Sequence, residues 1–169
     1  MELKPLDDPK LLEQIAEWMA LKENYQWLDF GSGKQMLSAV SLKIMAQRDI
    51  HVIRAFTDDS GEVPIGVVGL SNVDRRFKTA TPWCVLGDKR YAGRGYGNRA
   101  LSKILALGFR ELGLRSIFAW VVADNAVSLR MVERNNFRLI GRQRQCHDID
   151  GRHHDRLLFD LLASEHKEL

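Results

Sequence analysis

The stretch GDKRYAGRGYGNRALSKILALGF, residues 87–109, decides how this chain is interpreted. Three alternating glycines, Gly93, Gly95 and Gly97, lead directly into apolar residues at helical spacing. A loop so poor in side chains lets the backbone approach a ligand closely. The first turn of a helix also presents unpaired N–H groups and the positive end of the helix dipole. We therefore expect a phosphate-binding site at the start of this helix.

Two familiar phosphate-binding loops do not fit this stretch. The dinucleotide-binding fingerprint requires a third glycine three places after the second, where Asn98 stands. The Walker loop requires Gly-Lys followed by Ser or Thr, but Gly33-Lys34 is followed by Gln35. On the local pattern alone, a tight turn without a ligand remains the alternative.

The rest of the chain predicts a mixed α/β fold in the order β-α-α-β-β-β-α-β-α-β-β. Strands are expected at residues 1–6, 51–57, 63–73, 79–86 and 116–122, and two more within 137–162, joined at Asp150-Gly151. Helices are expected after Asp7 or Asp8 with Pro9 in the first turn, over 36–45, from the glycines to Gly113, and from Asn125 to Glu133. The segment KENYQWLDFGSGK, residues 22–34, is interpreted as a loop.

The composition of the chain limits the classes of protein to which it can belong. The chain has 169 residues and 45% hydrophobic content, which suits one domain over residues 1–169. Its 25 basic and 22 acidic residues give a net charge of +3, too weak to imply nucleic acid. Cys84 and Cys146 are the only cysteines, so a reducing compartment is expected. No apolar run suits a signal peptide or a membrane span, so we expect a soluble cytoplasmic protein without a membrane partner.

A strand followed by GDKRYAGRGYGNRAL, the strand SIFAWVV and then DNAVSLRMVERNNF resembles the GNAT superfamily of acyl-CoA N-acyltransferases. The likeness covers nearly the whole chain and is strongest to the branch with ribosomal-protein serine/alanine N-terminal acetyltransferases and some amino-sugar and polyamine acetyltransferases. It implies a mostly antiparallel sheet of about seven strands flanked by about four helices. A central parallel pair of strands, ending at Leu86 and Val122, would splay to admit acetyl-CoA.

The resemblance also implies which residues bind acetyl-CoA. Its pyrophosphate would lie on the backbone amides of Gly93, Arg94, Gly95, Tyr96, Gly97 and Asn98. Its pantetheine arm would pair with the backbone of Cys84, Val85 and Leu86, as an added strand does. Asn125 matches the family's asparagine that contacts this arm.

Three positions depart from the family pattern. Ala92 stands where an Arg or Gln usually begins the glycine motif, so the side-chain charge for phosphate would come from Arg90, Arg94 or Arg99. Val132 stands where many relatives carry a tyrosine near the thiol. Thr81 stands where many of this branch carry a glutamate.

Direct transfer requires a neutral amine, a stabilised oxyanion and a donor for the leaving thiolate. The resemblance makes the Leu86 amide the oxyanion donor. Ser128 lies one turn into the helix from Asn125, so its hydroxyl is a candidate donor to the thiolate; the alternative is that it only bonds the helix backbone. Asp74, Asp29 and Glu23 are candidate bases, directly or through water, or else solvated loop residues.

Several other residues have a functional and a plain interpretation. Tyr25, Trp27 and Phe30 form either an acceptor wall or packing between helices, whereas Trp83 and Trp120 are expected in the core. A solvated surface is the better interpretation of Arg134, Arg138, Arg142 and Arg144. No metal is expected at His147, His153 and His154, because further ligands at suitable spacing are missing. Cys146 is not expected to be a nucleophile.

The leading hypothesis is an acetyl-CoA-dependent N-acetyltransferase that acts on a primary amine within a ternary complex. The acceptor would be a small molecule or a peptide: a protein N-terminus, an amino sugar or a polyamine. A homodimer is a possible assembly, and a nucleic-acid partner is not expected. The alternative is a non-catalytic acyl-CoA-binding module on the same fold. A small nucleic-acid-binding domain, suggested by the arginines, is a weaker third hypothesis.

Overall fold

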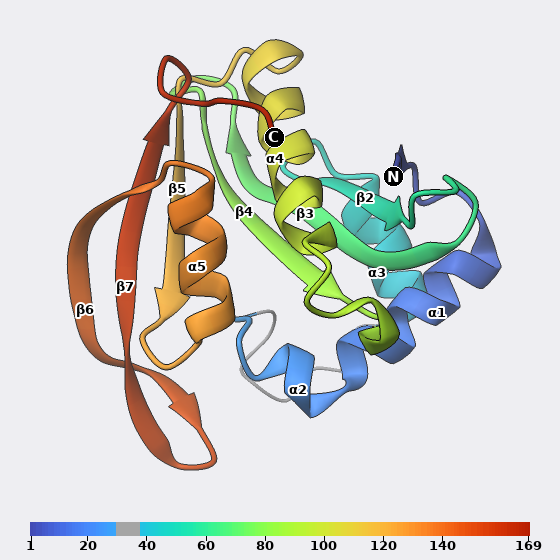
Figure 1. Ribbon diagram of the computed structural model, residues 1–169, viewed down its shortest axis with the longest axis horizontal. Helices are drawn as coiled ribbons and strands as arrows, with labels where there is room; N and C mark the ends of the chain where they lie inside the picture. The colour runs from blue at the N-terminus through green and yellow to red at the C-terminus, as the bar shows by residue number, and fades with distance from the viewer. Residues whose placement is uncertain (30–37) are drawn as a thin grey trace.

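The computed structural model describes residues 1–29 and 38–169 (Figure 1). Its sheet has seven strands in the order β1-β2-β3-β4-β5-β7-β6. The strands are β1 (Leu3–Lys4), β2 (Val52–Thr57), β3 (Pro64–Asp74), β4 (Thr79–Leu86), β5 (Ser116–Val122), β6 (Arg138–Ile149) and β7 (Arg152–Leu162). The helices are α1 (Pro9–Ala20), α2 (Lys22–Tyr25), α3 (Ala39–Ala46), α4 (Tyr96–Arg110) and α5 (Ala126–Arg134), with a 3-10 turn η1 (Lys89–Tyr91).

The predicted fold class is confirmed. Within the described residues β4 and β5 are the parallel neighbours, and the other neighbouring strands run antiparallel. The expected strands at 79–86 and 116–122 coincide with β4 and β5. Asp8 caps α1 by accepting from the Lys10 amide at 2.9 Å, with Pro9 in the first turn as expected.

The helix count and one loop differ from the sequence-based expectation. The described residues contain five α-helices where about four were expected, because α2 forms one turn inside the segment interpreted as a loop. A single turn is too short for apolar periodicity, and this one is fixed by buried Asn24, whose Nδ2 donates to Trp18 O at 2.7 Å. The helix expected over 36–45 is described from Ala39, with Ser38 as its cap; Met36 and Leu37 lie outside the described residues.

Helices cover both faces of the sheet and create two cores. α4 packs on one face, where Leu101, Ile104 and Leu105 meet apolar residues of β2, β3, β5 and β7. α1 and α3 pack on the other face over β2, β3 and β4. Figure 1 shows α4 and α5 in front of the sheet and α3 behind it. The second core ends at β4, which leaves that face of β5 and β7 without these helices.

A split in the middle of the sheet positions the site. β4 and β5 pair only at Thr79↔Ser116 and Ala80↔Ile117 and then separate. The Gly87 amide donates to Ile65 O at 2.9 Å on the β3 side. Since amides alternate in direction along a strand, those of Cys84 and Leu86 point away from β3 and into the split.

Across residues 1–29 and 38–169, no helix combines the length and the apolar character needed to cross a membrane.

Candidate active site

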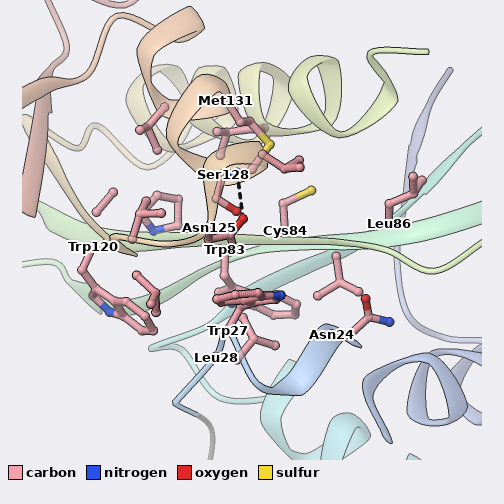
Figure 2. A pocket seen from close by; sticks show the side chains of 18 of the residues that line it. Asn24, Trp27, Leu28, Trp83, Cys84, Leu86, Trp120, Asn125, Ser128 and Met131 are labelled. Atoms are coloured by element: carbon pink, nitrogen blue, oxygen red, sulfur yellow. Dashed lines mark hydrogen bonds between the residues drawn. The ribbon is translucent and has the colours of Figure 1, made fainter. Parts of the chain in front are cut away.

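A cleft of about 820 Å³ occupies the split between β4 and β5. Its walls come from both strands, the start of α5 and residues 21–29, which we call the acceptor wall after the hypothesis for Trp27. Figure 2 shows Ser128 and Met131 on one side of β4, and Trp27 and Leu28 on the other. Of the sequence-predicted residues, the cleft brings together Cys84, Val85, Leu86, Asn125 and Ser128. The glycine loop does not line it but follows directly after Ala92, which does.

The glycine loop is an open cradle at the start of α4. Gly93 and Gly95 have φ angles of +75° and +79°, a left-handed conformation that favours glycine. Nothing described lies within 4 Å of a Cβ built at either position. Gly95 is the N-cap of α4 and contributes no side-chain hydrogen bond, so the amides of the first turn stay open to a ligand. This geometry fits the phosphate groups that the sequence predicts there.

Side chains in and near this loop serve mostly to fix it. Tyr96 is buried and its hydroxyl donates to Asp59 Oδ2 at 2.9 Å, while Arg99 Nη1 donates to Asp59 Oδ1 at 2.8 Å. Asn98 Oδ1 accepts from Asn135 Nδ2 at 2.8 Å, which ties α4 to the end of α5. Any contact of Tyr96 to phosphate therefore falls to its backbone amide.

The three candidate arginines differ in their partners. Arg90 pairs with Asp88 at 2.7 Å and Arg99 pairs with Asp59 at 2.8 Å. Arg94 pairs with no carboxylate of the described residues, and its guanidinium lies 5.5 Å from the centre of the Tyr91 ring. Arg94 is therefore the one of the three whose charge is not neutralised by a neighbour.

Asn125 and Ser128 stand where α5 meets the cleft. Asn125 Oδ1 accepts from the Ser128 amide at 3.1 Å, which confirms the predicted N-cap and leaves the Asn125 NH₂ group for other contacts (Figure 2). Ser128 is half-buried and lines the cleft. Its Oγ makes no hydrogen bond with any residue in the described part of the chain, so the backbone-bonded alternative is not what the structure contains. Val132, one turn on, is buried.

Cys84 places a thiol in the cleft without making it a nucleophile. Burial raises the pKa of the Cys84 thiol to about 12, so it stays protonated near neutral pH. Its Sγ donates weakly to Gly97 O at 3.7 Å. The thiol therefore belongs to the packing between β4 and α4.

The end of β4 is held by residues that sequence reasoning missed. Lys89 Nζ donates to Leu86 O at 2.7 Å and to Asn24 Oδ1 at 2.6 Å, and Glu23 lies 3.8 Å away. A Cβ built at Gly87 would lie 1.9 Å from Trp18 Cδ2, so only glycine fits against this indole. Both contacts fix the peptide around Leu86, whose amide faces the split. No local sequence pattern predicts these contacts, because the partners are far apart in the chain.

Three tryptophans line the cleft, and two of them were expected only in the core. Trp27 lines the cleft, so its role as an acceptor wall stays a prediction, whereas Tyr25 is not a lining residue and Phe30 lies outside the described residues. Trp83 is buried but reaches the cleft, because the missing Cβ of Gly69 lets its indole lie against β3. Trp120 is half-buried and lines the cleft as well.

Each of the three candidate bases already has a hydrogen-bond or ion-pair partner in the structure. Asp74 accepts from the amides of Arg76 and Phe77 at 2.8 Å in the β3–β4 turn and does not line the cleft. Glu23 and Asp29 do line it, but Glu23 faces Lys89 and Asp29 faces Arg156.

A histidine near Thr81 was missed by sequence reasoning. His51 Nδ1 lies 3.1 Å from Ser71 Oγ, which also accepts from Trp83 Nε1 at 2.9 Å. Burial, with a smaller contribution from Arg48, lowers the pKa of His51. His51, Ser71 and Thr81 all line the cleft, so a neutral imidazole stands beside the position where many relatives carry a glutamate.

The remaining histidines do not assemble a metal site in the described ranges, where no group of three or more His, Cys, Asp or Glu side chains could hold an ion. His153 pairs with Asp148 at 3.4 Å, and His154 contacts Asp124. His147 is buried and bonds to the acceptor wall.

Comparisons with known proteins agree with this geometry. The family model described as an acetyltransferase (GNAT) domain matches residues 1–138. An uncharacterized N-acetyltransferase p20 of Bacillus licheniformis is 29% identical over 132 residues, 78% of this chain and 71% of its own length. The putative ribosomal N-acetyltransferase YdaF of Bacillus subtilis (strain 168) is 25% identical over 165 residues, 94% of this chain and 89% of its own.

Among solved structures, the spermidine N-acetyltransferase of Vibrio cholerae in complex with CoA and spermine has a TM-score of 0.76 and 17% identity. The match covers 97% of this chain and 96% of that one. At this identity the likeness establishes the fold alone. With the family model spanning most of the sequence, the chain belongs to the GNAT family of N-acetyltransferases.

Proposed function

We propose that this protein transfers an acetyl group from acetyl-CoA to a primary amine by direct attack, with both substrates bound together. The observation that carries the proposal is the split between β4 and β5, which opens beside the bare glycine cradle at the start of α4. A cleft that continues through the sheet lets two substrates meet from opposite faces, and holding them together supplies much of the acceleration.

The proposed cosubstrate site uses mainly backbone groups. The amides of Gly93, Gly95 and Gly97, with those of the intervening residues, would hold the pyrophosphate, with Arg94 as the available side-chain charge. The backbone of Cys84, Val85 and Leu86 would bind the pantetheine arm, since two of these amides point into the split. Asn125 would contact the same arm through its NH₂ group. When bound, acetyl-CoA supplies the activated thioester.

The catalytic roles proposed for this chain fall to Leu86 and Ser128. The Leu86 amide would donate to the developing oxyanion, because it points into the split and its peptide is fixed through Lys89. The Ser128 hydroxyl, free of other partners in the described residues, would donate to the leaving thiolate. The three indole rings that line the cleft would exclude water from the reacting groups.

The charges of the cleft favour an acceptor with a single amine, such as a peptide N-terminus. The described lining has three carboxylates, and each already contacts a basic side chain: Glu23 with Lys89, Asp29 with Arg156, and Asp124 with His154. A polyamine would bring additional ammonium groups that find no unpaired carboxylate among these residues. The name of YdaF, a putative ribosomal N-acetyltransferase, agrees with this choice.

The experiment is thiol release from acetyl-CoA across a panel of serine- and alanine-terminated peptides, amino sugars and spermidine. We expect turnover with peptides above all. CoA binding without turnover of any amine would instead favour the non-catalytic binding module.

The cosubstrate site has a separate test in Gly95→Glu. This variant combines backbone strain with a bulky negative charge where phosphate would lie, whereas Gly95→Ala carries the strain alone. Isothermal titration should find CoA affinity reduced at least about tenfold more in Gly95→Glu than in Gly95→Ala. Equal affinity of the two folded variants would rule out the glycine loop as the phosphate site.

A further inference from the structure

The acceptor wall has little internal structure to hold it in place. Residues 21–29 contain only the single turn of α2, and short helices are marginal without packing. On the side of β4 the wall is held by Asn24, which accepts from Lys89. On the other side it is held by the β6–β7 hairpin, which lies far along the chain and bonds to it through His147.

His147 is the buried residue that the hairpin contributes to this contact, beside an exposed ion pair between Asp150 and Lys22. Of the twelve residues of β6, all described, it alone is buried, with 5% of its surface exposed. The pairing of β6 with β7 shifts register between Gln143 and His147, and Gln145 takes a positive φ of 50°. Such a bulge redirects the side chains that follow it. The bulge is fixed by Asp155, whose Oδ1 accepts from the Gln145 amide at 2.9 Å.

Both ring nitrogens of His147 have partners, and these define its tautomer. Nε2 lies 2.7 Å from Gln26 O, and since a carbonyl only accepts, Nε2 carries the proton. Nδ1 accepts from Arg156 Nη2 at 2.9 Å and from Arg156 Nε at 3.2 Å. A neutral imidazole is required for both bonds. Burial, the largest cause, lowers the pKa of His147 and keeps the ring neutral.

Arg156 extends the same contact to the cleft. Its Nη1 reaches Asp29 Oδ2 at 3.3 Å, and its guanidinium lies 3.7 Å from the centre of the Trp120 ring. Asp29 and Trp120 both line the cleft. The planar guanidinium thus joins the end of the acceptor wall, the buried histidine and β5 in one arrangement that lysine, with a point charge, cannot reproduce.

We propose that His147 and Arg156 are positioning residues for the acceptor: they hold the acceptor wall against β5 and so determine where Trp27 and Leu28 stand in the cleft. The inference rests on the proposed function, because these residues form an acceptor site only if the amine enters on this side. Neither residue touches the reacting atoms, so both act through the wall.

Hydrogen exchange of the amides in residues 21–28 tests this without any substrate. Arg156→Met keeps an apolar stem over Trp120 but loses the guanidinium, and His147→Leu loses both ring bonds. We expect exchange in this segment to become about tenfold faster in each variant, as the loss of one or two good hydrogen bonds implies. His147→Gln should recover part of the protection, because its amide can both donate to Gln26 O and accept from Arg156.

The matched control is Arg138→Met, which removes an exposed arginine of the same hairpin that pairs with Glu165 at 2.6 Å, away from both the wall and the bulge. Its exchange in residues 21–28 should equal that of the wild type. Wild-type exchange in folded Arg156→Met and His147→Leu would overturn the proposal. If His147→Leu does not fold, Arg156→Met and His147→Gln decide the question.

Kinetics separate this inference from the proposed function. With the amine of the panel that the wild type acetylates best, Arg156→Met should raise the KM for that amine about tenfold, with the KM for acetyl-CoA and kcat nearly unchanged. A fall in kcat with an unchanged amine KM would contradict the positioning role. A wild type that acetylates no amine would refute the proposed function, while the exchange data would still decide whether the pair holds the wall.

Discussion

At the scale of single residues, the departure from the family pattern at Val132 raises the question of which group donates to the leaving thiolate. Ser128 is the candidate. The usual tyrosine position is occupied by Val132, which is buried and can donate no proton. The Ser128 hydroxyl lies one turn nearer the start of α5, lines the cleft and has no other partner in the described residues. Thiolate departure therefore has one candidate side-chain donor on this helix.

Ser128→Ala should lower kcat about tenfold and leave the KM for acetyl-CoA nearly unchanged. One donor to an oxyanion contributes about 2.7–4 kcal/mol, and a thiolate, as a better leaving group, needs less help. Steady-state kinetics with acetyl-CoA and with a thioester of a more acidic thiol measure the effect. The loss should be smaller for the second thioester, and equal losses would mean that Ser128 orients substrate instead.

At the scale of elements, the end of β4 depends on a glycine that the sequence does not mark. Gly87 lies directly beneath the indole of Trp18 from α1, and the following turn is fixed by Lys89. The strand therefore ends in one position, with the Leu86 amide aimed into the split. The packing of α1 onto the end of β4 therefore helps to determine the position of the Leu86 amide.

Gly87→Ala should destabilise the protein by about 1–3 kcal/mol, because the new methyl group and the indole cannot occupy the same space. Gly141→Ala is the matched control, since a Cβ there lies 3.8 Å from Leu158, an ordinary contact. Urea unfolding should find the control within about 0.5 kcal/mol of the wild type. Similar stabilities of the two variants would show that Trp18 moves aside freely.

Much of the fold could be predicted from the sequence, because it depends on residues that are neighbours in the chain. Contacts between residues far apart in the chain could not be predicted in this way. The Asn125 cap, the bounds of β4 and β5 and the turn at Asp150-Gly151 depend on neighbouring residues, and sequence patterns record such neighbours. The bonds from Lys89 to Asn24 and from His147 to Gln26 join residues that meet only after folding. The bulge that turns His147 inward has no signature in QRQCH, so the contacts that support the acceptor wall could not be predicted.

At the scale of the whole molecule, three histidines, one buried and two partly buried, link stability to pH. Burial is the largest cause that lowers the pKa of His51, His147 and His166 below the ordinary value. His51 also faces Arg48; His147 faces Arg156 and His154 from β7 and Asp29 from the acceptor wall; His166 faces Arg110 and Glu168. Neither ring nitrogen of His166 has a partner among the described residues.

These histidines should therefore not reduce the free energy of unfolding above about pH 6.5, the ordinary histidine pKa, and should reduce it progressively as the pH drops below that value. In that range the unfolded chain binds protons that the folded protein excludes, so the free energy of unfolding decreases with decreasing pH. Urea unfolding at pH 7.5 and 5.5 measures the change. His166→Phe should make the dependence shallower, and an equally steep dependence would assign it to other groups.

The distribution of tryptophan gives the molecule a built-in optical reporter. The chain has four tryptophans: Trp27, Trp83 and Trp120 line the cleft, and Trp18 covers Gly87 at the end of β4. Two of these indoles stand beside elements that hold the site, Trp120 under a guanidinium and Trp18 over the strand end. Emission excited selectively at tryptophan therefore originates in the cleft and at the adjoining end of β4, and a change in its wavelength or intensity reports on these two regions without an attached dye.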